Sequence, residues 1–217
     1  MTHDVQIPYL NVNSVYIDFL NIRYIMVPQL YDPIGNNNPD RYSLVRDSRD
    51  LNYKLYENRT ALPRFFLVPK AVAFSSQDDV RAEISRGEAD PRSAIFTTGQ
   101  DLAKIPGIDP DCQNLDESNT TVNSYKTNSI ELSIYSPCNA FLATSEVMYP
   151  GWKAYLNNTE IPILTSNLVF RSVYIPQGRH VLLMKYIPVD FMIGFMITTL
   201  TTIVFGIYYI YVSKFRK

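Results

Sequence analysis

Few side chains in this sequence have the types and spacing that catalysis or metal binding requires. Histidine occurs only at His3 and His180, and a serine or cysteine nucleophile needs a histidine held by a third group. His180 follows a turn directly and is better explained as a surface residue. The carboxylates of Asp109 and Asp111 could contact a hard cation, but the residues after them lack the spacing of a calcium loop. We therefore predict no catalytic, cofactor-binding or metal-binding residue in this chain.

Cys112 and Cys138 are the two cysteines, and the sequence leaves their state open. In an oxidising compartment they could form a disulfide, and elsewhere they would be separate thiols. Neither cysteine has a second cysteine or a histidine at the spacing of zinc ligands, so a zinc site is not expected.

An aromatic group near the middle of the chain could bind sugar rings. It comprises Tyr149, Trp152, Tyr155 and Tyr174. A single tryptophan just after a turn is also typical of a core residue whose indole N–H bonds to a carbonyl. The sequence leaves both alternatives open for Trp152.

The composition is that of an ordinary globular domain with a β-rich bias. The chain has 20 basic and 21 acidic residues and no basic stripe, so no nucleic-acid partner is expected. It has 16 tyrosines and 11 phenylalanines but only 8 glycines, a balance that favours strands.

Residues 1–50 are predicted to form a connecting segment. It contains a short helix at Ser14–Leu20 and a strand at Ile22–Val27. Turn-forming residues, including three consecutive asparagines, predict a loop over residues 31–50.

Residues 51–188 are predicted to form a mainly β domain, an antiparallel β-sandwich or jelly-roll-like fold with one or two short helices. One helix is expected at 77–85, with Ser76 as its N-cap and Gly87 after its last turn. Regular strands separated by turn residues indicate this fold class. The expected strands are 52–57, 64–74, 92–98, 122–127, 129–136, 139–147, 152–156, 160–165, 168–175 and 179–186.

Three pairs of turn residues separate the late strands. Pro150-Gly151 suits the central positions of a type II turn. Asn157-Asn158 tolerates the left-handed conformation that a tight hairpin needs. Gln177-Gly178, after Pro176, predicts a second hairpin.

Residues 189–212 are predicted to form a transmembrane helix, followed by a basic cytoplasmic tail over residues 213–217. The run from Phe191 to Val212 has no charged side chain, and about 20 helical residues cross the ~30 Å bilayer core. Basic residues after a span favour the cytoplasmic side, which would place the preceding domain outside the cell membrane.

The predicted topology conflicts with the start of the sequence. The first apolar stretch, Val15–Val27, is short and contains Asp18 and Arg23, so it is neither a transmembrane helix nor a signal peptide. Two explanations follow, a tail-anchored protein or the C-terminal piece of a larger membrane protein, and we favour the second.

Small residues recur every four positions along the predicted membrane helix. They are Gly194, Thr198, Thr202 and Gly206. Such a stripe lets another helix approach closely, so we predict packing against other transmembrane helices of a parent protein or an oligomer.

Several segments, in order along the chain, resemble the C-terminal region of one known family. They are Leu20-Asn21-Ile22-Arg23-Tyr24-Ile25, Tyr56-Glu57-Asn58 with Leu62-Pro63-Arg64-Phe65, Tyr149-Pro150-Gly151-Trp152-Lys153-Ala154, and Asn167, Phe170-Arg171 and Pro176-Gln177-Gly178-Arg179-His180 through Tyr186-Ile187-Pro188. Together they resemble the YfhO-type family of bacterial polytopic membrane proteins. The family usually has Asp-Gly where this chain has Asn157-Asn158, which keeps the turn chemistry.

The resemblance implies a membrane-embedded transferase that uses a lipid-phosphate-linked sugar and glycosylates cell-envelope polymers. In such enzymes the acidic catalytic residues lie in an early extracytoplasmic loop that this chain lacks, so none is carried over and activity of this chain alone is not expected. We expect the sandwich to contact a lipid-linked sugar or an envelope polymer through Tyr149, Trp152, Arg64 and Arg171. An arginine can pair bidentately with phosphate. The alternative is a non-catalytic, membrane-anchored module that binds glycan or protein.

Overall fold

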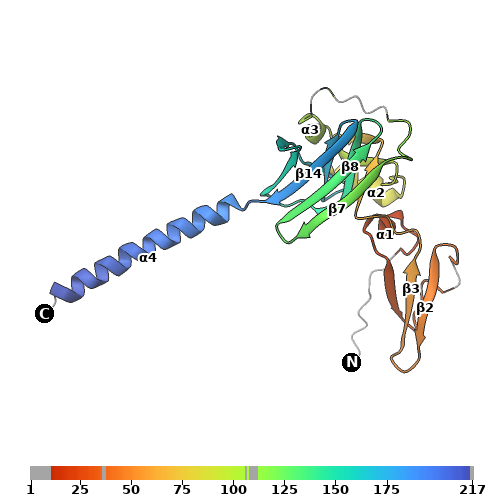
Figure 1. Cartoon of the computed structure of the whole chain (residues 1–217). Coiled ribbons are helices and arrows are strands. Elements are labelled where there is room, and N and C mark those ends of the chain that lie inside the picture. Colours follow the sequence, from red (N-terminus) through yellow and green to blue (C-terminus); the bar gives the residue numbers. More distant parts are fainter. Residues whose placement is uncertain (1–10, 36–37, 106, 108–111, 216–217) are drawn as a thin grey trace.

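The chain folds into a two-sheet body, a small three-stranded sheet beside it, and a long C-terminal helix that extends away from both (Figure 1). The computed structural model describes residues 11–35, 38–105, 107 and 112–215. His3, Asp109 and Asp111 therefore lie outside the described residues.

The described residues form short strands connected mostly by tight turns. The strands are β1 (Tyr24–Pro28), β2 (Tyr42–Ser48), β3 (Tyr53–Asn58), β4 (Phe65–Val68), β5 (Lys70–Phe74), β6 (Ala94–Thr98), β7 (Asn119–Lys126), β8 (Ser129–Ser136), β9 (Ala140–Val147), β10 (Trp152–Leu156), β11 (Thr159–Ile161), β12 (Leu164–Ser166), β13 (Phe170–Ile175) and β14 (Gly178–Tyr186). The helices are α1 (Val15–Phe19), α2 (Gln77–Arg86), α3 (Gly99–Leu102) and α4 (Val189–Phe215).

The body is the predicted β-sandwich. One sheet has the order β4-β9-β13-β12-β6-β5 and the other the order β11-β10-β14-β8-β7. All pairings are antiparallel except β5 with β6. In Figure 1 the strands β7, β8 and β14 lie at the front of the body, with no helix over them. The mainly β fold class with short helices and a C-terminal apolar helix is confirmed.

The core between the two sheets follows from strand alternation. In β8, Ile130, Leu132 and Ile134 are buried while the residues between them are partly exposed, because successive side chains of a strand point to opposite faces. Leu142 and Val173 approach the same core from the other sheet. Each such fully buried side chain stabilises the fold by about 1.5–3 kcal/mol relative to an exposed one.

Local signals in the sequence placed the Asn157-Asn158 turn and the α2 cap correctly. Asn157 and Asn158 both have positive φ (49° and 70°), as a tight hairpin requires. Ser76 caps α2 in a reciprocal capping box with Asp79. Gly87 ends that helix in the left-handed conformation, with φ 77°.

Four of the expected elements were wrong, two because of pairing between distant strands and two because a proline interrupts a strand. The expected loop over 31–50 contains β2, which pairs with β3 around a bulge. The expected strand 64–74 is two strands, because Pro69 has no amide hydrogen to continue a ladder. Pro162 likewise divides 160–165 between the two sheets. Gln177-Gly178 joins β13 to β14 in opposite sheets, so it is a crossover rather than a hairpin.

Strand β3 belongs to the small sheet rather than to the sandwich. It lies between β1 and β2, and its apolar face packs with Val12, Ile17 and Ile34 in a separate cluster. The domain boundaries predicted from the sequence stay a prediction.

Cys112 and Cys138 form a disulfide. Their Cα atoms lie 5.3 Å apart, within the range that a bridge needs. The bond ties the segment before β7 to the turn between β8 and β9, and it resolves the alternative left open by the sequence.

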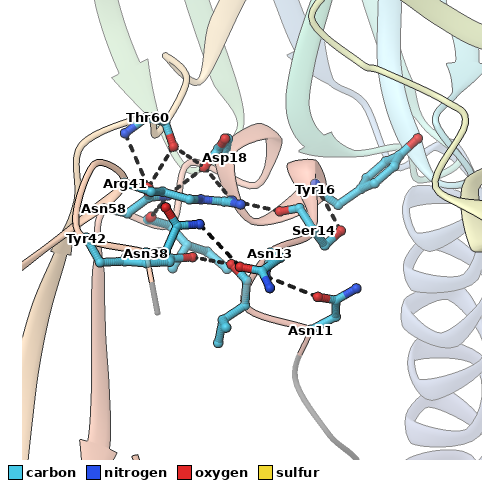
Figure 2. Close-up of polar contacts among 12 residues, drawn as sticks. Asn11, Asn13, Ser14, Tyr16, Asp18, Asn38, Arg41, Tyr42, Asn58 and Thr60 are labelled. Carbon is cyan, nitrogen blue, oxygen red and sulfur yellow. Dashed lines mark hydrogen bonds and ion pairs between the residues drawn. The ribbon is translucent and has the colours of Figure 1, made fainter. Parts of the chain in front are cut away.

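A buried carboxylate, Asp18, joins the small sheet to the sandwich (Figure 2). Its side chain is 1% exposed. Oδ1 accepts hydrogen bonds from Arg41 Nη2 at 2.8 Å, Asn58 Nδ2 at 2.8 Å and Thr60 Oγ1 at 2.9 Å. Oδ2 accepts from Arg92 Nη2 at 3.3 Å. Residues from α1, the small sheet and the α2–β6 connection thus converge on one carboxylate.

The neighbours of Asp18 enter two different hydrophobic clusters. Ile17 packs under the small sheet, whereas Phe19 packs against the six-stranded sheet, with its ring 5.1 Å from that of Phe170. One turn of helix therefore anchors both bodies, with the carboxylate between them.

Asp32 is a second polar centre, inside the small sheet. Its carboxylate accepts from Lys54 Nζ at 2.9 Å and Tyr56 Oη at 2.7 Å, and from the backbone amides of Ile34 and Gly35. Burial raises the pKa of Asp32, but these hydrogen bonds outweigh burial and lower the pKa to about 2.

Replacing Asp18 by Ala should reduce the free energy of unfolding by about 3–5 kcal/mol, because buried Arg41 would lose its partner. The measurement is urea unfolding of the full chain in detergent, combined with hydrogen exchange of β1–β3. Asp18→Asn should lose less, and Asp116→Ala, in an exposed loop, should change little. Equal stability of Asp18→Ala and wild type would contradict the role of this carboxylate.

The small sheet should lose stability in acid. The folded pKa of Asp32, about 2, lies below its ordinary value of 3.8. Its contribution of about 2 kcal/mol is therefore complete above pH ~4 and is lost as the pH falls towards 2. Urea unfolding at pH 6, 4 and 2.5 should show this loss in wild type and in the control Asp40→Asn. A loss of the same size in Asp32→Asn would exclude Asp32 as its source.

Candidate functional site

The end of the sandwich nearest α4 carries a cluster of charged and aromatic residues. Only two residues separate Tyr186, the end of β14, from Val189, the start of α4. Trp152 pairs with Tyr186 in the sheet. The Ile187 amide donates to the Gly151 carbonyl at 2.7 Å. This end of the sandwich is thereby held to the base of the helix.

Gly151 is fitted to this junction. Its φ is 105°, a conformation that other residues rarely adopt. A Cβ at Gly151 would lie 3.0 Å from the Ile187 oxygen and 3.0 Å from the Tyr186 ring. The glycine of the Pro150-Gly151 turn therefore permits the close approach to the start of α4.

Glu146, near the end of β9, is the centre of the cluster. Its Oε1 accepts from Arg64 Nη1 at 3.1 Å and from Tyr125 Oη at 2.7 Å. Its Oε2 accepts from Arg171 Nη2 at 3.1 Å. One carboxylate on β9 thus links the residue before β4 to β7 and β13, across both sheets.

Arg171 is a buried cation that lies against Trp152. Its side chain is 2% exposed, and its Cζ lies 3.7 Å from the Trp152 ring centroid. Burial lowers the pKa of Arg171, and the charge of Glu146 opposes this effect. Among the described residues, its Nε and Nη1 have no hydrogen-bond partner. The ring therefore replaces part of the lost solvation through a cation–π contact.

Arg64 lies at the edge of the same cluster and is about half exposed. Its Nη1 also donates to Tyr125 Oη at 2.9 Å. Burial lowers the pKa of Arg64, but the contacts with Tyr125 and Glu146 outweigh burial and raise the pKa above its ordinary value. Burial and the bond to Glu146 raise the pKa of Tyr125.

A hollow of about 310 Å³ opens beside Arg64. Its lining is largely apolar with a single cationic group, which suits a ligand that has an apolar part and an anion. The lining residues are Pro63, Arg64, Phe65, Thr120, Val122 and Tyr125.

The four contact residues predicted from the sequence lie in this one region. Tyr149 is 61% exposed, and its ring lies 6.2 Å from that of Tyr186. The Tyr186 ring lies 5.6 Å from Trp152. Arg64 and Arg171 meet at Glu146. The structure thus brings the four together, while their contact with a ligand stays a prediction.

The two alternatives for Trp152 both describe part of its environment. Trp152 is half-buried and packs against the core between the sheets. Tyr155 lies on the opposite face of β10, because the two differ by an odd number of positions. Tyr174 packs against Phe141, with ring centroids 5.5 Å apart. These four aromatic residues therefore do not form one platform.

Sequence reasoning missed Glu146, Tyr125 and Tyr186. One feature of the sequence could have indicated Glu146: it is the single charged residue in the otherwise neutral strand Ala140–Val147. Its connection to Arg64 and Arg171 depends on strand order, which the sequence did not indicate.

The five-stranded sheet carries a second, larger hollow of about 720 Å³. Asn119, Tyr135 and Arg179 are aligned across β7, β8 and β14, and Arg179 lies over the Tyr135 ring at 4.9 Å. His180 lies at its edge, where its Nδ1 is 3.0 Å from Asn157 Nδ2. His180 is thus a surface residue that stabilises a turn.

No group of three or more His, Cys, Asp or Glu side chains with metal-binding geometry occurs among the described residues. The expectation of no metal or cofactor stays a prediction, since Asp109 and Asp111 lie outside those residues.

Helix α4 is long and apolar enough to cross a membrane. Along the predicted stripe, Thr198 Oγ1 donates to the Gly194 carbonyl at 2.9 Å and Thr202 Oγ1 donates to the Thr198 carbonyl at 2.8 Å. Both hydroxyls are thus hydrogen-bonded within the helix. The stripe from Gly194 to Gly206 therefore consists of small side chains, and its two threonine hydroxyls are paired.

Comparison with known proteins gives one match. Residues 107–198 match the family model of the bacterial membrane protein YfhO. They include α4 as far as Thr198 and the strands from β7 to β14. No curated protein and no solved structure matches the chain. The match confirms the resemblance over this region and, with α4, a membrane protein region.

Replacing Glu146 by Gln should lower the free energy of unfolding by about 3 kcal/mol, because Arg171 would remain buried without a counter-charge. The measurement is urea unfolding in detergent, followed by the fluorescence of Trp152, the one tryptophan. The control Glu160→Gln breaks an exposed pair with Lys153 and should cost at most about 1 kcal/mol. Similar losses in both variants would contradict the proposed role of Glu146.

Proposed function

We propose, from the YfhO-type region over residues 107–198, that this chain is the extracytoplasmic C-terminal domain and last membrane helix of a glycosyltransferase. The enzyme would use a lipid-linked sugar and act on cell-envelope polymers. Catalysis would belong to membrane segments outside this chain, and the sandwich would hold donor or acceptor at the membrane surface.

The single observation that carries this proposal is the position of the charged and aromatic cluster. The cluster lies within the matched region or directly against it, at the end of the sandwich joined to α4 by two residues. A lipid-linked sugar phosphate has its anion near the headgroups, at the depth where Arg64 and the adjoining hollow would lie. Tyr149 is exposed in the same region, next to Tyr186, and an exposed aromatic ring can stack on a sugar.

The four predicted contact residues differ in burial, and we assign them two different roles. Tyr149 and Arg64 are exposed enough to touch a ligand. Arg171 and Trp152 would hold Glu146 and Tyr186 in place beneath them, because Arg171 is buried and stacked on Trp152. We assign the second pair a positioning role.

The extracytoplasmic placement has two independent supports. The Cys112–Cys138 disulfide is typical of an oxidising compartment. Basic residues at the end of α4 favour a cytoplasmic C-terminus. The small-residue stripe from Gly194 to Gly206 would face other transmembrane helices of the parent protein.

The second candidate function is a membrane-anchored, non-catalytic module that binds glycan or protein. The hollow on the five-stranded sheet favours it, since amide and hydroxyl groups there surround Tyr135 and Arg179. Such a lining suits the hydroxyl groups of a saccharide. Binding through this face would not need Tyr149 or Arg64.

Impermeant maleimide labelling in intact cells tests the orientation. Thr121→Cys, on the exposed side of β7, should react, because the domain is proposed to lie outside. Ser213→Cys, at the far end of α4, should react only after lysis. Protection of Thr121→Cys together with labelling of Ser213→Cys would establish the opposite topology and exclude the proposal.

Tyr149→Ala in the longer protein should lower transfer to the envelope polymer at least tenfold and leave unfolding unchanged, since Tyr149 is exposed. Transfer and thermal unfolding should be measured on the same samples. Trp152→Ala should lower both, because it removes packing under Arg171. The matched control is Tyr135→Ala, in the other hollow. Loss of transfer in Tyr135→Ala but not in Tyr149→Ala would favour binding at the five-stranded sheet.

A further inference from the structure

The small sheet exposes an unusual amount of apolar surface. Among the described residues before α4, more than half of the large hydrophobic side chains that are exposed lie between Leu20 and Leu51. Leu30 is 93% exposed, Leu51 is 66% exposed and Met26 is 64% exposed. Apolar patches of this kind on a folded domain mark an interaction surface.

These side chains are arranged along one strand and one end of the sheet. In β1, Ile25 and Val27 point into the cluster under the sheet, whereas Tyr24 and Met26 point outward. Leu30 and Tyr31 follow in the turn after β1, and Leu51 lies in the turn between β2 and β3. We call Tyr24, Met26, Leu30, Tyr31 and Leu51 the outer apolar surface.

Contacts connect the junction between the small sheet and the sandwich to the start of α4. Six residues connect Asn58, the end of β3, to Phe65, the start of β4. Arg64, in this connection, pairs with Glu146, and Glu146 also pairs with Arg171. Arg171 lies against Trp152, whose ring packs next to that of Tyr186. Figure 1 shows α4 leaving the sandwich on the left and the small sheet extending downward from its lower right, so the two diverge.

The position of a bilayer follows from this arrangement. Two residues between β14 and α4 span at most ~7 Å, so the base of the sandwich must lie at the membrane surface if α4 crosses the membrane. Transmembrane helices are tilted by about 20° on average, and a tilt of the chain towards the small sheet brings the membrane surface closer to the far end of that sheet. Its strand β2, with seven residues, can reach ~23 Å from the junction.

The chemistry of the outer apolar surface suits the headgroup region. Two amides in these turns are hydrogen-bonded, with Gln29 N–H donating to the Asn52 carbonyl at 3.2 Å and Tyr31 N–H donating to the Pro28 carbonyl at 3.2 Å. Insertion would leave these two amides paired. The nearby carboxylate of Asp32 is already neutralised by Lys54 at 2.9 Å. Tyrosine and arginine, here Tyr31 and Arg49, are favoured at membrane interfaces.

We propose that the outer apolar surface rests in the lipid headgroup layer and makes a second membrane contact for this chain. The occupant is the bilayer that α4 enters. This contact would hold the sandwich in one orientation above the membrane, with the hollow beside Arg64 facing the lipid. The inference requires α4 to span a membrane and does not depend on transferase activity.

The test is a depth measurement with spin labels on the full chain in vesicles of phosphatidylcholine and phosphatidylglycerol (3:1). Labels are placed at Leu30→Cys and Leu51→Cys, with the native cysteines left paired. The matched control is Val181→Cys, an exposed apolar position on the five-stranded sheet. The ratio of oxygen to nickel-chelate accessibility should be at least threefold higher at residues 30 and 51 than at 181.

Equal ratios at the three sites would overturn the proposal. A second variant tests the contact by changing residue 30 while the label stays at residue 51. Leu30→Asp should lower the ratio at residue 51 towards that of residue 181, and circular dichroism should show unchanged β-structure because Leu30 is exposed. The high ratio at residues 30 and 51 could also disappear when the protein is diluted tenfold in lipid. That result would identify a second copy of the chain as the occupant, and it would also overturn the proposal.

Discussion

The carboxylate of Asp18 is the interaction on which the rest of the structure depends. It is buried between two hydrophobic clusters and accepts hydrogen bonds from Arg41, Asn58, Thr60 and Arg92. A buried charge is tolerated only when its partners replace water, so these four side chains must be in place together. They come from three separate parts of the chain. The helical turn that carries Asp18 therefore fixes where the small sheet sits relative to the sandwich.

At the base of the sandwich, a second carboxylate is paired with cationic side chains. Glu146 balances two arginines, and Arg171 is stacked on Trp152. Trp152 pairs with Tyr186, and two residues separate Tyr186 from the start of α4. The charge network and the start of α4 are thus one structural unit. A substitution in this unit should change the stability of the sandwich, so a test of the proposed ligand contacts must measure stability on the same samples.

Much of the fold could be predicted from local chemistry. The Asn157-Asn158 turn, the Ser76 cap and the alternation of Ile130, Leu132 and Ile134 all depend on residues close in sequence. The errors occurred where pairing was distant. β2 has weak strand character but pairs with β3, and Gln177-Gly178 connects the two sheets. For the site, the sequence indicated Arg64, Arg171, Trp152 and Tyr149 but not Glu146, because a carboxylate between two arginines becomes visible only when β4, β9 and β13 are adjacent.

The sequence by itself determined the class of the molecule: a β-rich domain, an apolar C-terminal helix long enough to cross a membrane, and the resemblance that the match over residues 107–198 confirmed. These properties depend on composition, period and ordered local motifs. The tertiary structure alone decided that Cys112 pairs with Cys138, that the small sheet is a separate body, and that Glu146 and its two arginines gather at the end of the sandwich joined to α4. The physical reason is that these features depend on strand order, which brings together residues that are not neighbours in sequence.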